Sequence, residues 1–80
     1  MSKLKVLSGK DLIKIFNFFG FKVISQKGSY AKLRKVLSDG SQQTLTIPIH
    51  KELDRGTLLA IFNQSLRYIL EEELRSHFYT

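Results

Sequence analysis

The sequence predicts an α+β domain in which helices cover one face of a small three-stranded antiparallel sheet. Two stretches, 9–19 and 56–65, repeat apolar residues at helical spacing. Between them lie three runs typical of strands, separated by Lys27-Gly28 and by the turn-forming stretch 38–42. Because short turns join antiparallel neighbours, we expect a meander whose second face is open to solvent.

The first helix is expected from Gly9 to Phe19. Ser8 suits the N-cap, Asp11 lies in the first turn, where the helix dipole favours an acid, and Gly20 ends the helix. Its inward stripe contains Leu12, Ile15, Phe16 and Phe19. Phe18 lies on the polar side, where either a partner contact or a simply exposed aromatic residue fits the pattern.

The strands are expected at 21–26, 29–37 and 43–49, with 38–42 as a hairpin loop. The alternation of apolar and polar residues favours a register in which paired residue numbers add to 80. That register pairs apolar residues on the buried face, namely Leu33 with Ile47 and Ala31 with Ile49. On the outer face it places Tyr30 opposite His50, Lys32 opposite Pro48 and Arg34 opposite Thr46.

The second helix is expected at about 56–65, with an inward stripe of Leu58, Ile61, Phe62 and Ser65. A short, frayed helical segment follows at 68–78. We therefore expect one domain over residues 1–80, with its core at about 8–65 and a C-terminal extension at 66–80. Whether that extension packs on the domain or on a partner is open at this stage.

Composition narrows the function classes. The chain has 80 residues, no cysteine and two histidines, which excludes disulfides and thiolate ligands and argues against a metal site. No apolar run approaches the roughly 18 residues that a membrane span needs, and the basic N-terminus does not lead into a signal-peptide core. We expect a cytoplasmic protein without membrane, metal or cofactor.

The positive charge is concentrated in the first two-thirds of the chain. Residues 1–50 hold nine Lys or Arg against Asp11 and Asp39, whereas residues 51–80 hold four against five acids. Such a basic region attracts polyanions, which makes nucleic acid the leading partner class. The alternative is a charged surface that only keeps the protein in solution.

Several short motifs, in this order and spacing, resemble the HicA toxins, the messenger-RNA interferases of HicA/HicB type II toxin-antitoxin systems. The resemblance runs from about residue 8 to residue 64 and is carried by Lys27-Gly28-Ser29 with the basic strand, 46–50 (TIPIH), 56–58 (GTL) and 61–64 (IFNQ). It implies a fold similar to the double-stranded-RNA-binding domain. It also implies a metal-independent endoribonuclease that blocks translation by cutting messenger RNA, and a HicB-like antitoxin that covers the active site.

The sequence departs from the family pattern at one position. The resemblance implies a catalytic histidine after Gly28-Ser29, and this chain has Tyr30 there. Metal-free RNA cleavage needs a group that takes the 2′-hydroxyl proton or protonates the leaving oxygen, and imidazole suits this near neutral pH. Phenols titrate near pH ~10 and are poor bases, although they can donate a hydrogen bond or stack on a base.

Three interpretations follow. In the first, Tyr30 is a substitution that makes the toxin inactive. In the second, His50, on the same expected face, supports weak cleavage. In the third, the chain binds RNA or its protein partner without cutting. His50 could instead have only a structural role at the end of the third strand. His77, in the acidic tail, is given no role. The candidate RNA-binding residues are Lys27, Gly28, Ser29, Lys32, Arg34 and Lys35, of which Lys35 is expected to point toward the helices.

Overall fold

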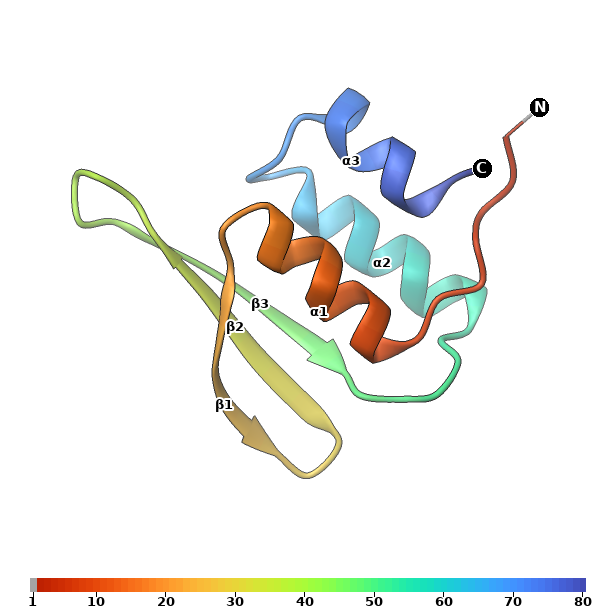
Figure 1. The fold of residues 1–80 in the computed structure, drawn as a ribbon, viewed down its shortest axis with the longest axis horizontal. Helices are drawn as coiled ribbons and strands as arrows, with labels where there is room; N and C mark the ends of the chain where they lie inside the picture. The colour runs from red at the N-terminus through yellow and green to blue at the C-terminus, as the bar shows by residue number, and fades with distance from the viewer. Residues whose placement is uncertain (1) are drawn as a thin grey trace.

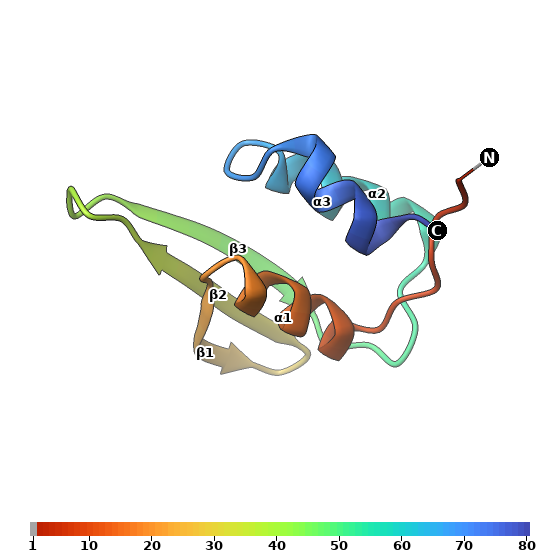
Figure 2. The ribbon, with the colours of Figure 1, turned by 45° about the horizontal axis from the view of Figure 1, so that its top comes forward.

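The computed structural model describes residues 2–80 and confirms the predicted α+β fold (Figure 1). The elements are α1 (Gly9–Phe18), β1 (Lys22–Lys27), β2 (Tyr30–Val36), β3 (Gln42–Pro48), α2 (Arg55–Ser65) and α3 (Glu71–Phe78). The strands form one antiparallel sheet in the order β1-β2-β3. All three helices lie on the same side of this sheet and leave its other side uncovered (Figure 2). No helix within residues 2–80 has the length and apolar character to cross a membrane.

Helix α1 begins after Ser8, the predicted N-cap, and the structure shows that Ser8 and Asp11 form a capping box. The Ser8 hydroxyl accepts from the Asp11 N–H at 3.0 Å, and the Asp11 carboxylate accepts from the Ser8 N–H at 2.9 Å. These hydrogen bonds stabilise the carboxylate and lower the pKa of Asp11 below its usual value. The helix ends at Phe18, one residue earlier than expected, and Gly20 follows with a φ of 96°.

The predicted register between the second and third strands is wrong by two residues. Leu33 pairs with Leu45 rather than Ile47, and Tyr30 pairs with Pro48 rather than His50. The cause is a shorter loop: the Leu37 N–H donates to the Ser41 carbonyl at 2.8 Å, which leaves three residues in the turn. A two-residue shift preserves the side-chain alternation, so the predicted inner and outer faces are correct.

That tight turn follows from its residues. Gly40 has a φ of 87°, which suits the left-handed position at the end of a three-residue hairpin loop. The Asp39 carboxylate accepts from the Ser41 N–H at 2.9 Å and from the Ser41 hydroxyl at 2.6 Å. These hydrogen bonds lower the pKa of Asp39 and favour the compact loop over the five-residue loop that we expected.

The register between β1 and β2 shifts by one residue at Ile24, between the pairs Val23–Leu33 and Ser25–Lys32. This is the pattern of a β-bulge, in which one extra residue reverses the alternation along the rest of the strand. On either side of Ile24, Lys22 lies opposite Arg34 and Lys27 lies opposite Tyr30. Both lysines therefore lie on the outer face, although they are five positions apart in the sequence and strict alternation would put them on opposite faces.

The core lies between the inner face of the sheet and the helices. Phe16 of α1 packs against Phe21 and Phe78, with ring centroids 6.0 and 6.2 Å apart. The four predicted inward residues of α2 are its buried residues. The C-terminal segment also packs on the domain, since Leu74 and Phe78 of α3 have no exposed surface. Buried residues thus extend beyond the expected core limit at residue 65.

Candidate nucleic-acid interface

The outer face of the sheet presents three rows of side chains that run across the strands. From the β1–β2 turn inward, the rows are Lys27–Tyr30–Pro48, Ser25–Lys32–Thr46 and Lys22–Arg34–Thr44. We call these nine residues the basic face. It contains four cations, and none of the three strands contains Asp or Glu. A surface with this composition attracts anions, and its hydroxyl groups can hydrogen-bond to phosphate or ribose.

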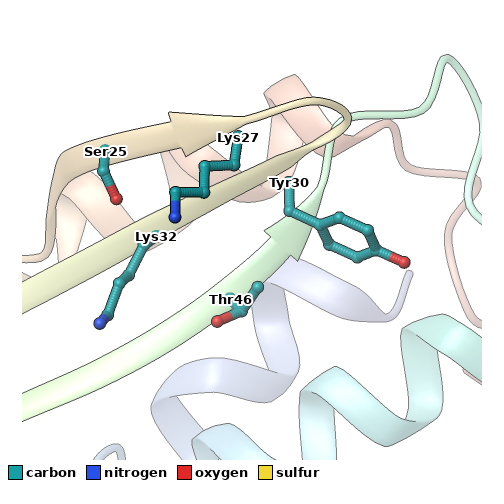
Figure 3. Close-up of a pocket in the computed structure, with 5 residues that line it drawn as sticks. All are labelled: Ser25, Lys27, Tyr30, Lys32 and Thr46. Carbon is teal, nitrogen blue, oxygen red and sulfur yellow. The ribbon is translucent and has the colours of Figure 1, made fainter.

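A shallow hollow of about 300 Å³ lies at the first two rows of the basic face (Figure 3). It is lined by Ser25, Lys27, Tyr30, Lys32 and Thr46. The two lysine side chains extend on the same side as Ser25, while the Tyr30 ring extends away from them. Tyr30 is 53% exposed, so one hollow combines two ammonium groups with an accessible aromatic ring. Phosphate binding and base stacking need these two kinds of group.

Gly28 and Ser29 shape this site through their backbone. Gly28 has a φ of 55° in the turn between β1 and β2, where residues with a side chain are disfavoured. The Ser29 carbonyl accepts from the Ile49 N–H at 2.6 Å, which ties the turn to the end of β3. The conformation of Gly28 and the hydrogen bond of Ser29 therefore hold the backbone that leads into Tyr30.

The structure separates Lys35 from the other predicted RNA-binding cations. Lys27, Lys32 and Arg34 share the basic face, whereas Lys35 lies on the helix side, as expected from the alternation. A Cβ atom at Gly20 would come within 3.2 Å of the Lys35 side chain, so the lysine stem covers that glycine. Sequence reasoning missed Lys22, because the bulge at Ile24 cannot be recognised from the residue pattern.

The expected position of His50 across the sheet from Tyr30 is wrong. His50 follows the end of β3 and lines a separate hollow of about 410 Å³ with Ser8, Lys10, Ile49 and Lys51. Its backbone carbonyl accepts from the Gly9 N–H at 2.9 Å, which joins this segment to the start of α1. Pro48 occupies the position opposite Tyr30, and it is buried.

The second histidine, His77, belongs to an aromatic group on the helix side. Its ring centroid lies 5.3 Å from that of Phe18 and 5.2 Å from that of Phe19. Phe18 is 75% exposed, so these contacts cover only part of its ring. Within residues 2–80, neither histidine belongs to a group of three or more side chains placed to hold a metal ion.

A family model described as the HicA toxin of bacterial toxin-antitoxin systems matches residues 9–66, which is more than half of the chain. The chain belongs to the HicA toxin family. Membership of the HicA family implies a toxin-antitoxin system, and therefore an antitoxin as a protein partner. The α+β fold agrees with that of a HicA protein. Comparisons with curated proteins and with solved structures gave no significant match.

Proposed function

We propose that this HicA-family chain is a messenger-RNA interferase by descent that binds RNA on the basic face and has lost efficient cleavage through Tyr30. The observation that carries the proposal is the hollow that combines Lys27, Lys32 and Tyr30 on a face without acids. RNA supplies phosphates for the lysines and an unpaired base for the ring. With messenger RNA as the target, the protein acts in the cytoplasm.

The family resemblance implies that the catalytic side chain is at position 30, directly after Gly28-Ser29, and Tyr30 lines the same hollow as Lys27 and Lys32. In metal-independent cleavage, a base removes the 2′-hydroxyl proton, the resulting oxyanion attacks the adjacent phosphorus, and the 5′-oxygen leaves with a proton from an acid. A phenol is a weak base at neutral pH, so Tyr30 can hold the RNA but accelerates the first step little. Lys27 and Lys32 remain available to stabilise the charge on phosphate.

The position of His50 argues against a substitute catalytic role for its imidazole. It lines the hollow at the start of α1 together with Lys10 and Lys51, whereas Tyr30 lines the hollow at the β1–β2 turn. We therefore assign His50 no part in cleavage at position 30.

A second function, favoured by the same charge, is a module that only binds an acidic surface of a HicB-like antitoxin. The two functions share the basic face and differ in whether RNA and antitoxin compete for it. If unlabelled RNA displaces the antitoxin from the chain, RNA binding to the basic face is supported. If excess RNA leaves antitoxin binding unchanged, the protein-only module is favoured.

The test compares the chain with Tyr30→His and Tyr30→Phe variants. We expect Tyr30→His to cleave messenger RNA at least about a hundredfold faster, the lower range of general acid–base catalysis, and to arrest growth. Tyr30→Phe controls for the phenol hydroxyl and is expected to remain inactive. Equal cleavage by the original chain and the Tyr30→His variant would move catalysis away from position 30. If none of the three proteins binds RNA, the proposal as a whole is contradicted.

A further inference from the structure

The row Lys22–Arg34–Thr44 lies outside the hollow around Tyr30 and has an unusual charge arrangement. Lys22 and Arg34 are direct partners in the β1–β2 register. Like charges directly opposite each other in an antiparallel pair destabilise the sheet. The one ion pair recorded within residues 2–80 joins Arg75 and Glu71 on α3, so neither Lys22 nor Arg34 is neutralised by a carboxylate.

Arg34 also has an unused hydrogen-bond donor. Its Nε atom is buried and has no hydrogen-bond partner within the described chain. Thr44 of β3, which pairs with Arg34 from the other side, places a hydroxyl group in the same row. A buried donor without a partner carries a desolvation cost, which an oxyanion placed between Lys22 and Arg34 would remove.

The bulge at Ile24 is the feature that creates this row. Without the register shift, regular pairing from Ser25–Lys32 backward would place Val23 opposite Arg34 and turn Lys22 toward the helices. The bulge therefore brings a fourth cation onto the basic face at the position directly opposite Arg34. Bulges commonly re-aim side chains beside functional sites.

We infer that Lys22 and Arg34, with Thr44, form a second phosphate-binding site for the same RNA strand that contacts Tyr30. Rows on one face of a strand lie about 7 Å apart, so this site is about 14 Å from the Tyr30 row. The spacing of successive phosphates in an extended single strand is similar to the spacing of neighbouring rows, so about two nucleotides span the distance between the two sites. The strand would run along β2, with a base at Tyr30 and a phosphate about two nucleotides away at Lys22 and Arg34. The inference rests on the proposed binding of RNA to the basic face.

Charge reversal at Lys22 separates RNA binding from stability. A Lys22→Glu variant places a carboxylate opposite Arg34, so the cross-strand repulsion becomes attraction and we expect the melting temperature to rise by a few degrees. The same change fills the phosphate site with a negative group, so we expect RNA affinity to fall at least tenfold. A row with only a structural role would show the rise in melting temperature without the loss of RNA affinity.

The binding experiment measures fluorescence anisotropy of a labelled hexauridine at several salt concentrations. Lys22→Gln is expected to lower the slope of log affinity against log salt by about 0.7, the value for one lost phosphate contact on a single strand. Lys14→Gln, which removes the same charge from α1, is the matched control and should leave the slope unchanged. Lys22→Arg should restore the original slope.

A double Lys27→Gln/Lys32→Gln variant distinguishes failure of the second phosphate site from failure of RNA binding on the basic face. If it weakens binding while Lys22→Gln behaves like Lys14→Gln, the second phosphate site is wrong and RNA binding at the hollow stands. If the double variant also matches the Lys14→Gln control, RNA does not bind the basic face, and both proposals fail.

Discussion

The two faces of the sheet have opposite chemistry although they share the same strands. On the inner face, Ala31, Leu33, Leu45 and Ile47 are at most 1% exposed and pack against the helices. On the outer face, the alternate residues of β2 are Tyr30, Lys32, Arg34 and Val36, and the strand has no acid to neutralise its cations. The inner face lowers the free energy of the fold, whereas the outer face keeps charges uncompensated. Alternate residues of one strand therefore contribute to the core and to the proposed RNA-binding face.

The sharpest test of this separation compares neighbours on β2. Leu33→Ala should reduce the free energy of unfolding by about 2–5 kcal/mol, because Leu33 is fully buried and its loss leaves a cavity. Lys32→Ala, one residue away on the exposed face, should change stability by less than about 0.5 kcal/mol and weaken RNA binding. Urea unfolding of both variants measures the difference. Similar losses of stability would show that the two faces are energetically coupled.

Gly9 tests whether the contact between α1 and the end of β3 can be disturbed without affecting the basic face. A Cβ atom at Gly9 would lie 2.7 Å from the Ile49 Cα and would also overlap the Pro48 carbonyl. Gly9→Ala should therefore cost about 1–3 kcal/mol through overpacking. Gly56→Ala is a milder control, since the nearest atom is a side-chain oxygen of Asp54 at 3.3 Å. Equal melting temperatures for the two variants would contradict the close contact.

The smallest expected effect concerns pH. Hydrogen bonds from Ser8 lower the pKa of Asp11 in the folded protein. The contribution of Asp11 to stability is therefore fully present above its pKa in the unfolded chain, about 3.9, and is lost as the pH falls through its lower pKa in the folded protein. Ser8→Ala should cost about 1 kcal/mol at pH 7 and reduce this acid dependence. Thermal melts between pH 7 and pH 2 provide the measurement. RNA binding at pH 7 should be unchanged, because Ser8 lies outside the basic face; an equal loss of binding would link the helix cap to that face.

Sequence alone predicted the features that depend on local chemistry. These features are the N-cap Ser8 with Asp11 in the first turn, the buried stripe of α2, and the inner and outer faces of β2, which follow from residue type and spacing. The register was missed because Asp39 and Gly40 support a shorter loop than the composition of 38–42 suggested. Because the true register differs by two residues, Pro48 and not His50 lies opposite Tyr30.

The candidate site was predictable only in part for a related reason. Lys32 and Arg34 could be placed on the face of Tyr30 by alternation. Lys27 was expected in the turn and not in β1, and Lys22 could not be placed there because Val23, Ile24 and Ser25 give no signal of a bulge. The packing of α3 was equally inaccessible, since an acidic, short helix has little intrinsic stability. Its Leu74 and Phe78 become fully buried only through contacts with segments distant in sequence.

Strand β1 is an exposed edge, with Val23 and Ile24 about 44–45% accessible, which is the kind of strand that recruits a second sheet. Lys22 and Lys27 flank those two residues, and the irregular backbone at Ile24 interrupts a continuous ladder. The charges that we propose bind RNA therefore also repel another copy of this edge. A variant stripped of these lysines gains a tendency to self-associate, so its RNA affinity is meaningful only when light scattering shows that it is monomeric.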